Sequence, residues 1–209
     1  MPYFLNNNTN ILFIHIPKNA GTSIEFYLSK KHNILLNEKS LYMFTEQNIT
    51  DFDNKISLQH QTLSTYIKYK DDFNINFNNI FIFCVVRNPY TRLISDLFFY
   101  NLITNKSTQN EVYNVIISYL INDNLDNHNI PQYKFITDEN NKIYNNVNIF
   151  KFENLKEDMI KNNFTDFDTN ENIGKYNKEP FLFLNNDSIQ AINKHYETDF
   201  IYFNYEMKQ

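Results

Sequence analysis

Two short segments of the chain combine residue types that bind phosphate groups in proteins. Residues 17–23 read Pro-Lys-Asn-Ala-Gly-Thr-Ser and hold one of only two glycines, and residues 87–92 read Arg-Asn-Pro-Tyr-Thr-Arg and hold both arginines. A loop that leads into a helix offers backbone N–H groups to a phosphate, and a guanidinium binds phosphate through two parallel hydrogen bonds. Because glycine and arginine are so rare here, we expect the chemistry of this protein in these two segments.

The first segment is predicted to be a phosphate-binding loop between a strand and a helix. Ligands of open α/β sheets bind beyond the carboxyl ends of the strands, which is where Lys18 would lie. In the common nucleotide-hydrolase loop the lysine follows a second glycine, but Lys18 precedes Gly21 by three residues and follows no glycine. The alternative is a plain strand–turn–helix joint with an exposed lysine. The residues expected to contact phosphate are Lys18, Asn19, Ala20, Gly21, Thr22 and Ser23.

The second segment pairs an arginine at a strand end with a serine on the following helix. Ser95 lies eight residues after Arg87 on a helix that Pro89 opens, so that both side chains could face one cleft. A guanidinium and a hydroxyl together suit a phosphate monoester. Arg92 would assist them or cap a surface. The alternative is an arginine paired with Asp96 or with a carboxylate of a lid.

Strands and helices are predicted to alternate along the chain. Short apolar runs indicate buried strands, and apolar residues at helical spacing indicate helices, the first of them capped by Thr22 or Ser23. The expected strands cover residues 11–16, 80–86 and 147–152, and the expected helices cover residues 22–32, 63–69, 89–100, 109–121, 155–161 and 187–196. This order predicts an α/β fold, a three-layer sandwich with a central parallel sheet.

The 209 residues are expected to form one domain, residues 1–209. Residues 1–10 are predicted to be a short N-terminal tail. Residues 123–146 are rich in Asn and Asp around a Pro-Gln-Tyr sequence and are predicted to form a loop or lid. We expect residues 33–79 and 123–146 to determine specificity.

Composition excludes several classes of function. A net charge of −5 argues against a nucleic-acid partner, and no apolar run approaches the roughly 18 residues of a membrane span.

The single cysteine, Cys84, and the absence of a secretory signal favour a cytoplasmic location. No clustered His, Asp or Glu spacing indicates a metal site. The 37 asparagines indicate an AT-rich genome and suggest a bacterial or viral origin.

Both segments resemble motifs of the sulfotransferases that use 3′-phosphoadenosine 5′-phosphosulfate (PAPS). Residues 13–23 are similar to their 5′-phosphosulfate loop, and residues 87–95 are similar to their 3′-phosphate motif, at a similar separation of about 70 residues. The similarity points to the Golgi-type carbohydrate sulfotransferases, including the uronyl and heparan 2-O and the chondroitin 4-O branches. Weaker similarity extends over residues 128–132, 150–155 and 195–205.

The resemblance implies a P-loop-NTPase-like fold and a sulfotransferase that moves a sulfuryl group to a hydroxyl acceptor, in particular a saccharide. It implies that Lys18 stabilises the leaving group, that the loop amides hold the 5′-phosphate, and that Arg87 and Ser95 hold the 3′-phosphate. Tyr176 and Lys178 would close over the adenine or the 3′-phosphate. The product would be adenosine 3′,5′-bisphosphate, and no metal would be needed.

A general base must take the proton of the acceptor hydroxyl, and a histidine suits neutral pH. The resemblance points to His60, because relatives carry a histidine in this interval, although a plain surface histidine is an open alternative. Glu25 and His128 are the other candidate bases. His15 is expected to serve core packing or a supporting hydrogen bond. The remaining histidines, His32 and His195, are expected to be structural or exposed.

Two other functions remain open at this point. A kinase-like enzyme on a related scaffold would bind ATP with magnesium and show no preference for a 3′-phosphate. A non-catalytic protein could keep the same fold to bind a glycan, a nucleotide or a protein partner. The position of Lys18 and the lack of a second loop glycine argue against the kinase.

Overall fold

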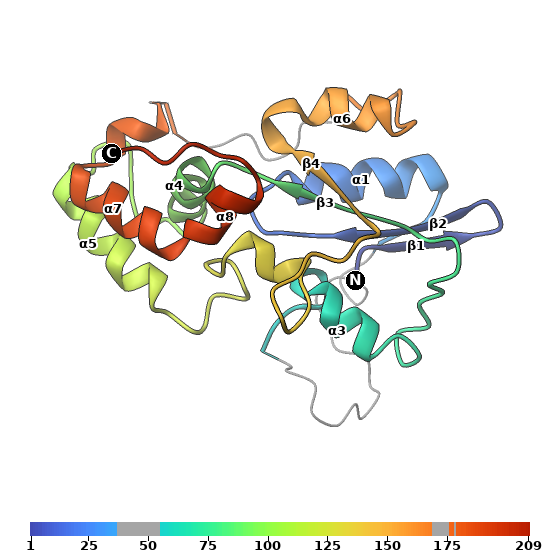
Figure 1. Cartoon of the computed structure of the whole chain (residues 1–209). Coiled ribbons are helices and arrows are strands. Elements are labelled where there is room, and N and C mark those ends of the chain that lie inside the picture. The colour runs from blue at the N-terminus through green and yellow to red at the C-terminus, as the bar shows by residue number, and fades with distance from the viewer. Residues whose placement is uncertain (37–54, 169–175, 178) are drawn as a thin grey trace.

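The computed structural model of the chain describes residues 1–36, 55–168, 176, 177 and 179–209 (Figure 1). The predicted site residue Lys178 and parts of the expected loops therefore lie outside the described residues. Four strands form one sheet in the order β1 (Tyr3–Asn6), β2 (Thr9–Ile14), β3 (Phe81–Val86) and β4 (Val147–Lys151). Strand β1 runs antiparallel to β2, and β2, β3 and β4 run parallel to one another.

Both faces of the sheet are covered, which confirms the predicted three-layer α/β sandwich. On one face lie the helices α1 (Gly21–His32) and α6 (Leu155–Lys161) (Figure 1). They pack on the aromatic side chains of the central strands, among them Phe13, Phe83 and Phe150. On the other face lie the 3-10 helix η1 (Leu58–His60) and the helix α3 (Leu63–Lys68). Strand side chains alternate between the two faces, so that β2 and β3 are buried on both sides and carry long apolar runs.

A second group of helices lies beyond the carboxyl ends of the strands (Figure 1). They share one apolar core that includes Leu97, Ile116, Ile192 and Phe200. The members are α4 (Pro89–Phe99), α5 (Gln109–Leu120), α7 (Asn186–His195) and α8 (Glu197–Tyr202), with the 3-10 helix η4 (Pro180–Phe183). Two more 3-10 helices, η2 (Gln132–Phe135) and η3 (Phe152–Asn154), join this group to the sheet. The predicted helices agree with α1, α3, α4, α5, α6 and α7 to within a few residues, whereas α8 was not predicted.

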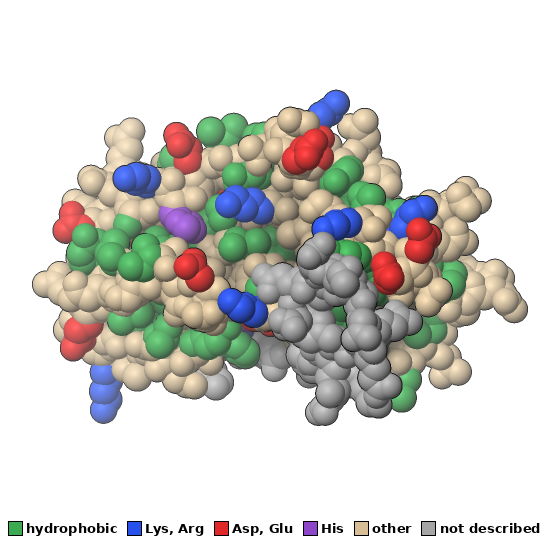
Figure 2. Space-filling view, turned by 90° about the horizontal axis from the view of Figure 1, so that it is seen from below, with side chains coloured by type: hydrophobic (Ala, Val, Ile, Leu, Met, Phe, Trp, Pro, Cys, Tyr) green, Lys and Arg blue, Asp and Glu red, His purple; other side chains and the backbone are tan. Residues whose placement is uncertain are grey.

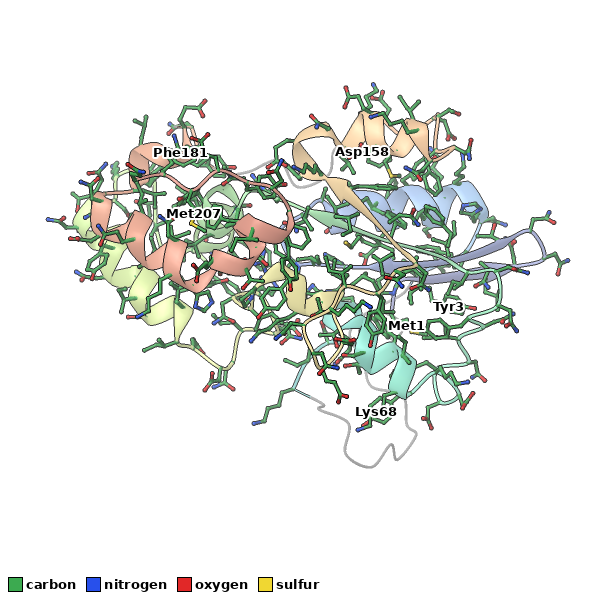
Figure 3. The ribbon with its side chains drawn as sticks, viewed as in Figure 1. Met1, Tyr3, Lys68, Asp158, Phe181 and Met207 are labelled. Atoms are coloured by element: carbon green, nitrogen blue, oxygen red, sulfur yellow. The ribbon has the colours of Figure 1, made fainter. Side chains whose placement is uncertain are left out.

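The prediction of an N-terminal tail over residues 1–10 is wrong. These residues form β1, a turn and the start of β2, and the two strands are paired from Tyr3–Leu12 to Asn6–Thr9. Phe4 has no exposed surface and packs in the core beneath α1, whereas Met1 and Tyr3 contact the core on the α3 side (Figure 3). The alternation of these side chains identifies the segment as an edge strand.

The segment 123–146 is a loop that contains η2, and its centre is buried instead of forming a lid over the surface. His128, Asn129 and Gln132 are buried, and Phe135 and Ile136 have no exposed surface and belong to the core on the α3 face. A buried loop needs partners for its backbone polar groups. Several such partners are long polar side chains that also build the site described below.

The edge strand can be tested with two neighbouring residues. Phe4→Ala should lower the free energy of unfolding by about 3–5 kcal/mol, because it empties a fully buried aromatic site. Leu5→Ala, at a residue that is 47% exposed, should lower it by less than about 1 kcal/mol. Urea denaturation of both variants gives the comparison. Equal, small effects would indicate that the segment is a tail after all.

Candidate active site

The loop between β2 and α1 is shaped to present backbone N–H groups. Lys18 and Ala20 both adopt positive φ, at 70° and 65°, which is unusual for residues other than glycine. Helix α1 begins at Gly21, and its N-cap Ala20 makes no side-chain hydrogen bond, so the prediction that Thr22 or Ser23 caps the helix is wrong. The first N–H groups of a helix have no partner within the helix. Together with the helix dipole they favour an anion at this point.

Gly21 is required because an imidazole ring lies directly against it. A Cβ on Gly21 would lie 1.9 Å from Nε2 of His15. The same ring forms a hydrogen bond of 2.7 Å between its Nδ1 and Oε1 of Glu25, and both side chains are buried. His15 thus fastens the end of β2 to the first turns of α1, as expected for a supporting hydrogen bond. Glu25, an alternative base, is engaged by this contact.

Arg87 lies at the carboxyl end of β3 and points toward the β2–α1 loop. Its Nη1 donates to the carbonyl oxygen of Lys18 at 3.0 Å, and its Nε donates to Oγ1 of Thr91 at 3.1 Å. Its Nη2 donates to the hydroxyl of Tyr176 at 3.1 Å, and the guanidinium carbon lies 4.1 Å from the ring centre of Phe152. The two predicted phosphate-binding segments are therefore in direct contact through this side chain.

A cavity of about 680 Å³ opens beside Arg87. Thr91, Phe152 and Tyr176 contribute to its walls together with Glu153 and Glu179, so it offers a cation, hydroxyl groups, two aromatic rings and two carboxylates. Ser95 is half-buried one helical turn beyond Thr91 on α4. Thr91, which sequence reasoning did not select, is the helix hydroxyl that contacts Arg87.

Arg92 neither caps a surface nor pairs with Asp96. It is only 2% exposed, and its guanidinium donates to three carbonyl oxygens: that of Pro17 at 3.2 Å, that of Ile130 at 3.0 Å and that of His128 at 2.6 Å. It therefore joins the β2–α1 loop to the buried centre of the segment 123–146. The role is structural, and the Arg92 side chain fixes the position of the β2–α1 loop.

His60 is held by a carboxylate from the segment 123–146. Its Nδ1 lies 2.7 Å from Oδ2 of Asp126, and Asp126 accepts hydrogen bonds from the backbone N–H of Ser57 at 2.6 Å and from its hydroxyl at 2.8 Å. Asn127 donates to the carbonyl oxygen of His60 at 3.0 Å. Asp126 and Asn127 both adopt positive φ. Such strain persists where the surrounding structure imposes it, often at functional sites.

These contacts define the protonation of the pair. Burial lowers the pKa of His60 to about 4, although the hydrogen bond to Asp126 opposes the shift. Burial also pushes the pKa of Asp126 upward, but the hydrogen bond and charge of His60, together with the bonds from Ser57, outweigh it and lower this pKa. At neutral pH an uncharged His60 therefore donates its Nδ1–H to an ionised Asp126. The lone pair of Nε2 is then available to accept a proton.

A row of contacting rings extends from His60 to Lys18. The imidazole of His60 makes edge-to-face contacts with His15 at 4.9 Å and with His128 at 5.0 Å between ring centres. His128 stacks on Phe99 at 5.6 Å, and Nζ of Lys18 lies 4.0 Å from the centre of the Phe99 ring. The structure thus brings the predicted lysine, the preferred base and the alternative base His128 into one region.

Other histidines serve the fold. His195 is half-buried on α7 and contacts the carbonyl oxygen of Asn129 at 3.1 Å, and burial lowers its pKa. His32 contacts Oγ1 of Thr9 at 2.9 Å at the end of α1. Both agree with the expected structural role.

Among the described residues, His60, Asp126 and His128 form one group that could hold a metal ion.

Sequence reasoning missed the residues that orient the site. Gln132, Asp126 and Phe152 lie in or next to segments similar to family motifs. Their contacts join positions about 45 to 113 residues apart, such as Gln132 with Arg87 and with Asn19, and Asp126 with His60. A carboxylate or amide at such a distance along the chain carries no periodic signal. Only the similarity of residues 128–132 and 150–155 to family motifs pointed to this part of the site.

One comparison with known proteins identifies a family. The family model described as "Sulfotransferase family" matches residues 1–206. No curated protein and no solved structure matches the chain. In the described part of the chain, no helix has the length and apolar character that a membrane crossing requires.

The contact between Gly21 and His15 can be tested by a double-mutant cycle. Gly21→Ala alone should lower the free energy of unfolding by about 1–3 kcal/mol, because the new methyl group displaces the His15 ring. In a His15→Ala background the same change should cost close to nothing, which gives a coupling of at least about 1 kcal/mol. Urea denaturation of the four proteins measures it. Additive effects would show that the ring does not impose glycine at this position.

Proposed function

The chain belongs to the sulfotransferase family, and we propose that it transfers a sulfuryl group from PAPS to a hydroxyl group of a saccharide. One observation carries the choice of donor. Arg87 lines the cavity and also donates to the carbonyl oxygen of Lys18 at 3.0 Å, so that this guanidinium lies between the cavity and the loop that leads into α1. PAPS carries anionic groups at its 5′ and 3′ positions, and two adjoining anion sites suit such a molecule.

The donor-binding residues are proposed as follows. The first-turn N–H groups of α1 and the side chain of Lys18 would bind the 5′-phosphosulfate. Arg87 would bind the 3′-phosphate, with Thr91 in reach and Ser95 one turn further along α4. Tyr176 and Phe152 offer ring faces for the adenine. PAPS supplies an electrophilic sulfur and a bisphosphate leaving group.

Besides donor binding, the reaction requires stabilisation of the leaving group and removal of a proton from the acceptor, and different residues are proposed for the two roles. Lys18 would stabilise the negative charge that develops on the leaving group, which is the principal electrostatic requirement of an in-line displacement. His60 is proposed as the general base: Nε2 accepts the proton of the acceptor hydroxyl, while Asp126 holds Nδ1–H and stabilises the imidazolium that forms. Lysine, arginine and backbone amides meet the donor's charge, so the proposal requires no metal.

The saccharide acceptor rests on the resemblance to the Golgi-type carbohydrate sulfotransferases. Exposed rings near Lys18, such as Phe99 at 51% exposure, suit stacking against a sugar. On the face seen from below, basic side chains are interspersed with acidic ones (Figure 2), and the net charge is −5. This charge pattern favours a neutral or weakly charged acceptor over a long polyanion, and no nucleic-acid partner is proposed.

Donor choice is tested by calorimetric titration with adenosine 3′,5′-bisphosphate, 5′-AMP and magnesium-ATP. The bisphosphate should bind with micromolar affinity, and the other two should bind much more weakly. Arg87→Ala should weaken bisphosphate binding by about 10- to 100-fold, because a charge-assisted contact is lost. Tyr176→Phe should weaken it less, and Tyr202→Phe, whose hydroxyl donates to the carbonyl oxygen of Asn141, should leave it unchanged.

The other outcomes of this titration separate the alternatives. A preference for magnesium-ATP would favour the kinase-like enzyme. Binding of none of the three nucleotides would favour a non-catalytic protein. Either result would overturn the proposed donor.

Replacing Lys18 separates chemistry from folding. Lys18→Ala should lower the rate of bisphosphate release from PAPS, in the presence of a saccharide panel, by about 100-fold or more. The midpoint of urea unfolding should change little, because the lysine is only half-buried. Lys30→Ala, at an exposed lysine in the last turn of α1, is the matched control and should keep full activity. Wild-type turnover in Lys18→Ala would remove this residue from the mechanism.

A further inference from the structure

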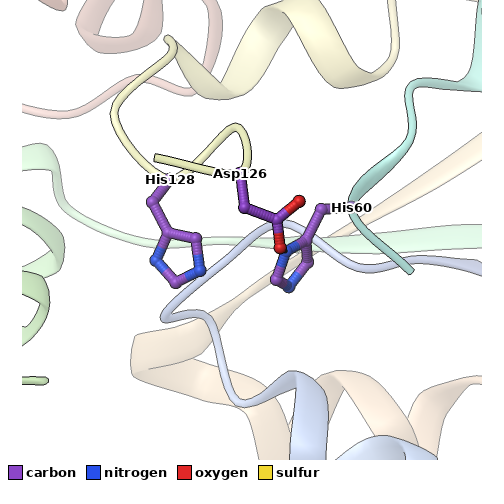
Figure 4. Close-up of side chains that lie close together, drawn as sticks. All are labelled: His60, Asp126 and His128. Carbon is purple, nitrogen blue, oxygen red and sulfur yellow. The ribbon is translucent and has the colours of Figure 1, made fainter. Parts of the chain in front are cut away.

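Two histidines and one carboxylate converge beside the proposed base. One ring nitrogen each of His60 and His128 and one oxygen of Asp126 lie within 4.8 Å of one another, and Figure 4 shows the three side chains grouped together. We infer that this group is a binding site for a divalent transition-metal ion of the zinc class, and that its occupation inhibits the enzyme. The inhibitory part rests on the proposed function, whereas the metal site does not.

The donor set suits zinc. Two imidazole nitrogens and one carboxylate oxygen are a common set of three protein ligands, which leaves a fourth position for water. Zinc binds nitrogen and oxygen at about 2.0–2.2 Å, so its ligand atoms lie roughly 3–3.5 Å apart. Nδ1 of His60 and Oδ2 of Asp126 are already 2.7 Å apart. The cluster reaches the required spacing through side-chain shifts of about one ångström.

Two of the three potential ligands, His128 and Asp126, are also oriented by hydrogen bonds from outside the cluster, as metal ligands commonly are. Nδ1 of His128 lies 2.8 Å from Oδ1 of Asp96, and Asp96 also accepts a hydrogen bond from the hydroxyl of Tyr119. The carboxylate of Asp126 accepts the two bonds from Ser57 described above. A histidine that is 7% exposed and fixed through Nδ1 presents its other nitrogen to the cluster.

Asp126 provides access from solvent. Its side chain is 32% exposed, whereas that of His60 is 6% exposed. An ion can therefore reach the cluster at Asp126 and keep a water molecule on its open side. The cluster combines two buried nitrogen ligands with one partly exposed oxygen ligand, as expected for a site that binds and releases its ion.

Metal binding would inhibit transfer by changing the tautomer of His60. An ion between Nδ1 of His60 and Oδ2 of Asp126 takes the place of the shared proton. The single proton of the neutral ring then resides on Nε2, and no net proton is released from the pair. Because Nε2 no longer has a lone pair, it cannot accept the proton of the acceptor hydroxyl. Transfer would stop while the donor-binding residues remain unchanged.

The metal site is tested by calorimetric titration of the chelator-treated full chain with ZnCl₂, and by visible absorption with Co²⁺. We expect one ion per chain with a micromolar or lower Kd. His128→Asn and Asp126→Asn should each weaken binding at least about tenfold. His32→Asn, which alters a histidine at the far end of α1, should bind zinc as the wild type does. Circular dichroism establishes that each variant is folded, and Asp126→Asn serves where His128→Asn does not fold.

The outcomes keep the metal site and the proposed function apart. Zinc binding that is absent, or that persists in both ligand variants, would overturn the metal site. With the site established, one equivalent of zinc should slow bisphosphate release from PAPS at least tenfold, and EDTA should restore it. Full activity of the zinc-loaded protein would overturn the inhibitory role. Failure of the bisphosphate titration would overturn the proposed function and leave the metal site standing.

Discussion

The side-chain amide of Gln132 holds the two halves of the candidate site together. Its oxygen accepts hydrogen bonds from the side chain of Asn19 at 2.7 Å and from the backbone N–H of Arg87 at 2.9 Å, and its Nε2 donates to the carbonyl oxygen of Arg87 at 2.8 Å. Beyond the ends of β2 and β3 the strands no longer pair, and buried backbone groups need other partners. Gln132, with no exposed surface, supplies them. Asp199 of α8 fixes it in turn by accepting from its backbone N–H at 2.8 Å. The spacing of the two segments that are predicted to bind phosphate therefore depends on this amide.

Arg92 likewise provides hydrogen-bond partners for buried backbone groups, in the β2–α1 loop and in the segment 123–146. The carbonyl oxygens of Pro17, His128 and Ile130 belong to no helix or strand, yet they lie against the buried guanidinium. Leaving one such group without a partner costs about 1–3 kcal/mol. An arginine has five donors in a rigid plane and can satisfy several carbonyls at once. This explains why Arg92 has a structural role, although both arginines of the chain lie in a sequence that resembles a phosphate-binding motif.

Local patterns predicted most of the fold, and long-range polar contacts were beyond their reach. The strands around Phe13 and Phe83 and the helix that Pro89 opens follow from apolar runs and from a residue that suits the first helical turn. The N-terminal strand was missed because Tyr3 and Phe4 precede a run of asparagines, which resembles a tail until β2 pairs with it. In the site, Lys18 and Arg87 could be predicted from rarity and position. The hydrogen bond between Arg87 and Lys18 could not be predicted, because a contact between residues about 70 positions apart produces no periodic pattern in the sequence.

Three buried histidines explain why the β2–α1 loop, the proposed base His60 and the segment 123–146 all contact the same row of rings. An imidazole in the interior must have a polar partner, and each of these rings has a carboxylate on Nδ1: His15 has Glu25, His60 has Asp126 and His128 has Asp96. The carboxylates come from α1, from the buried loop and from α4. Each pair therefore ties a different element to the same row of rings, and the edge-to-face contacts of about 5 Å align the row. A ring that moved would break its own hydrogen bond to the carboxylate and the packing of its neighbours. The geometry at His60 thus follows from burial and satisfied polarity, before any substrate is considered.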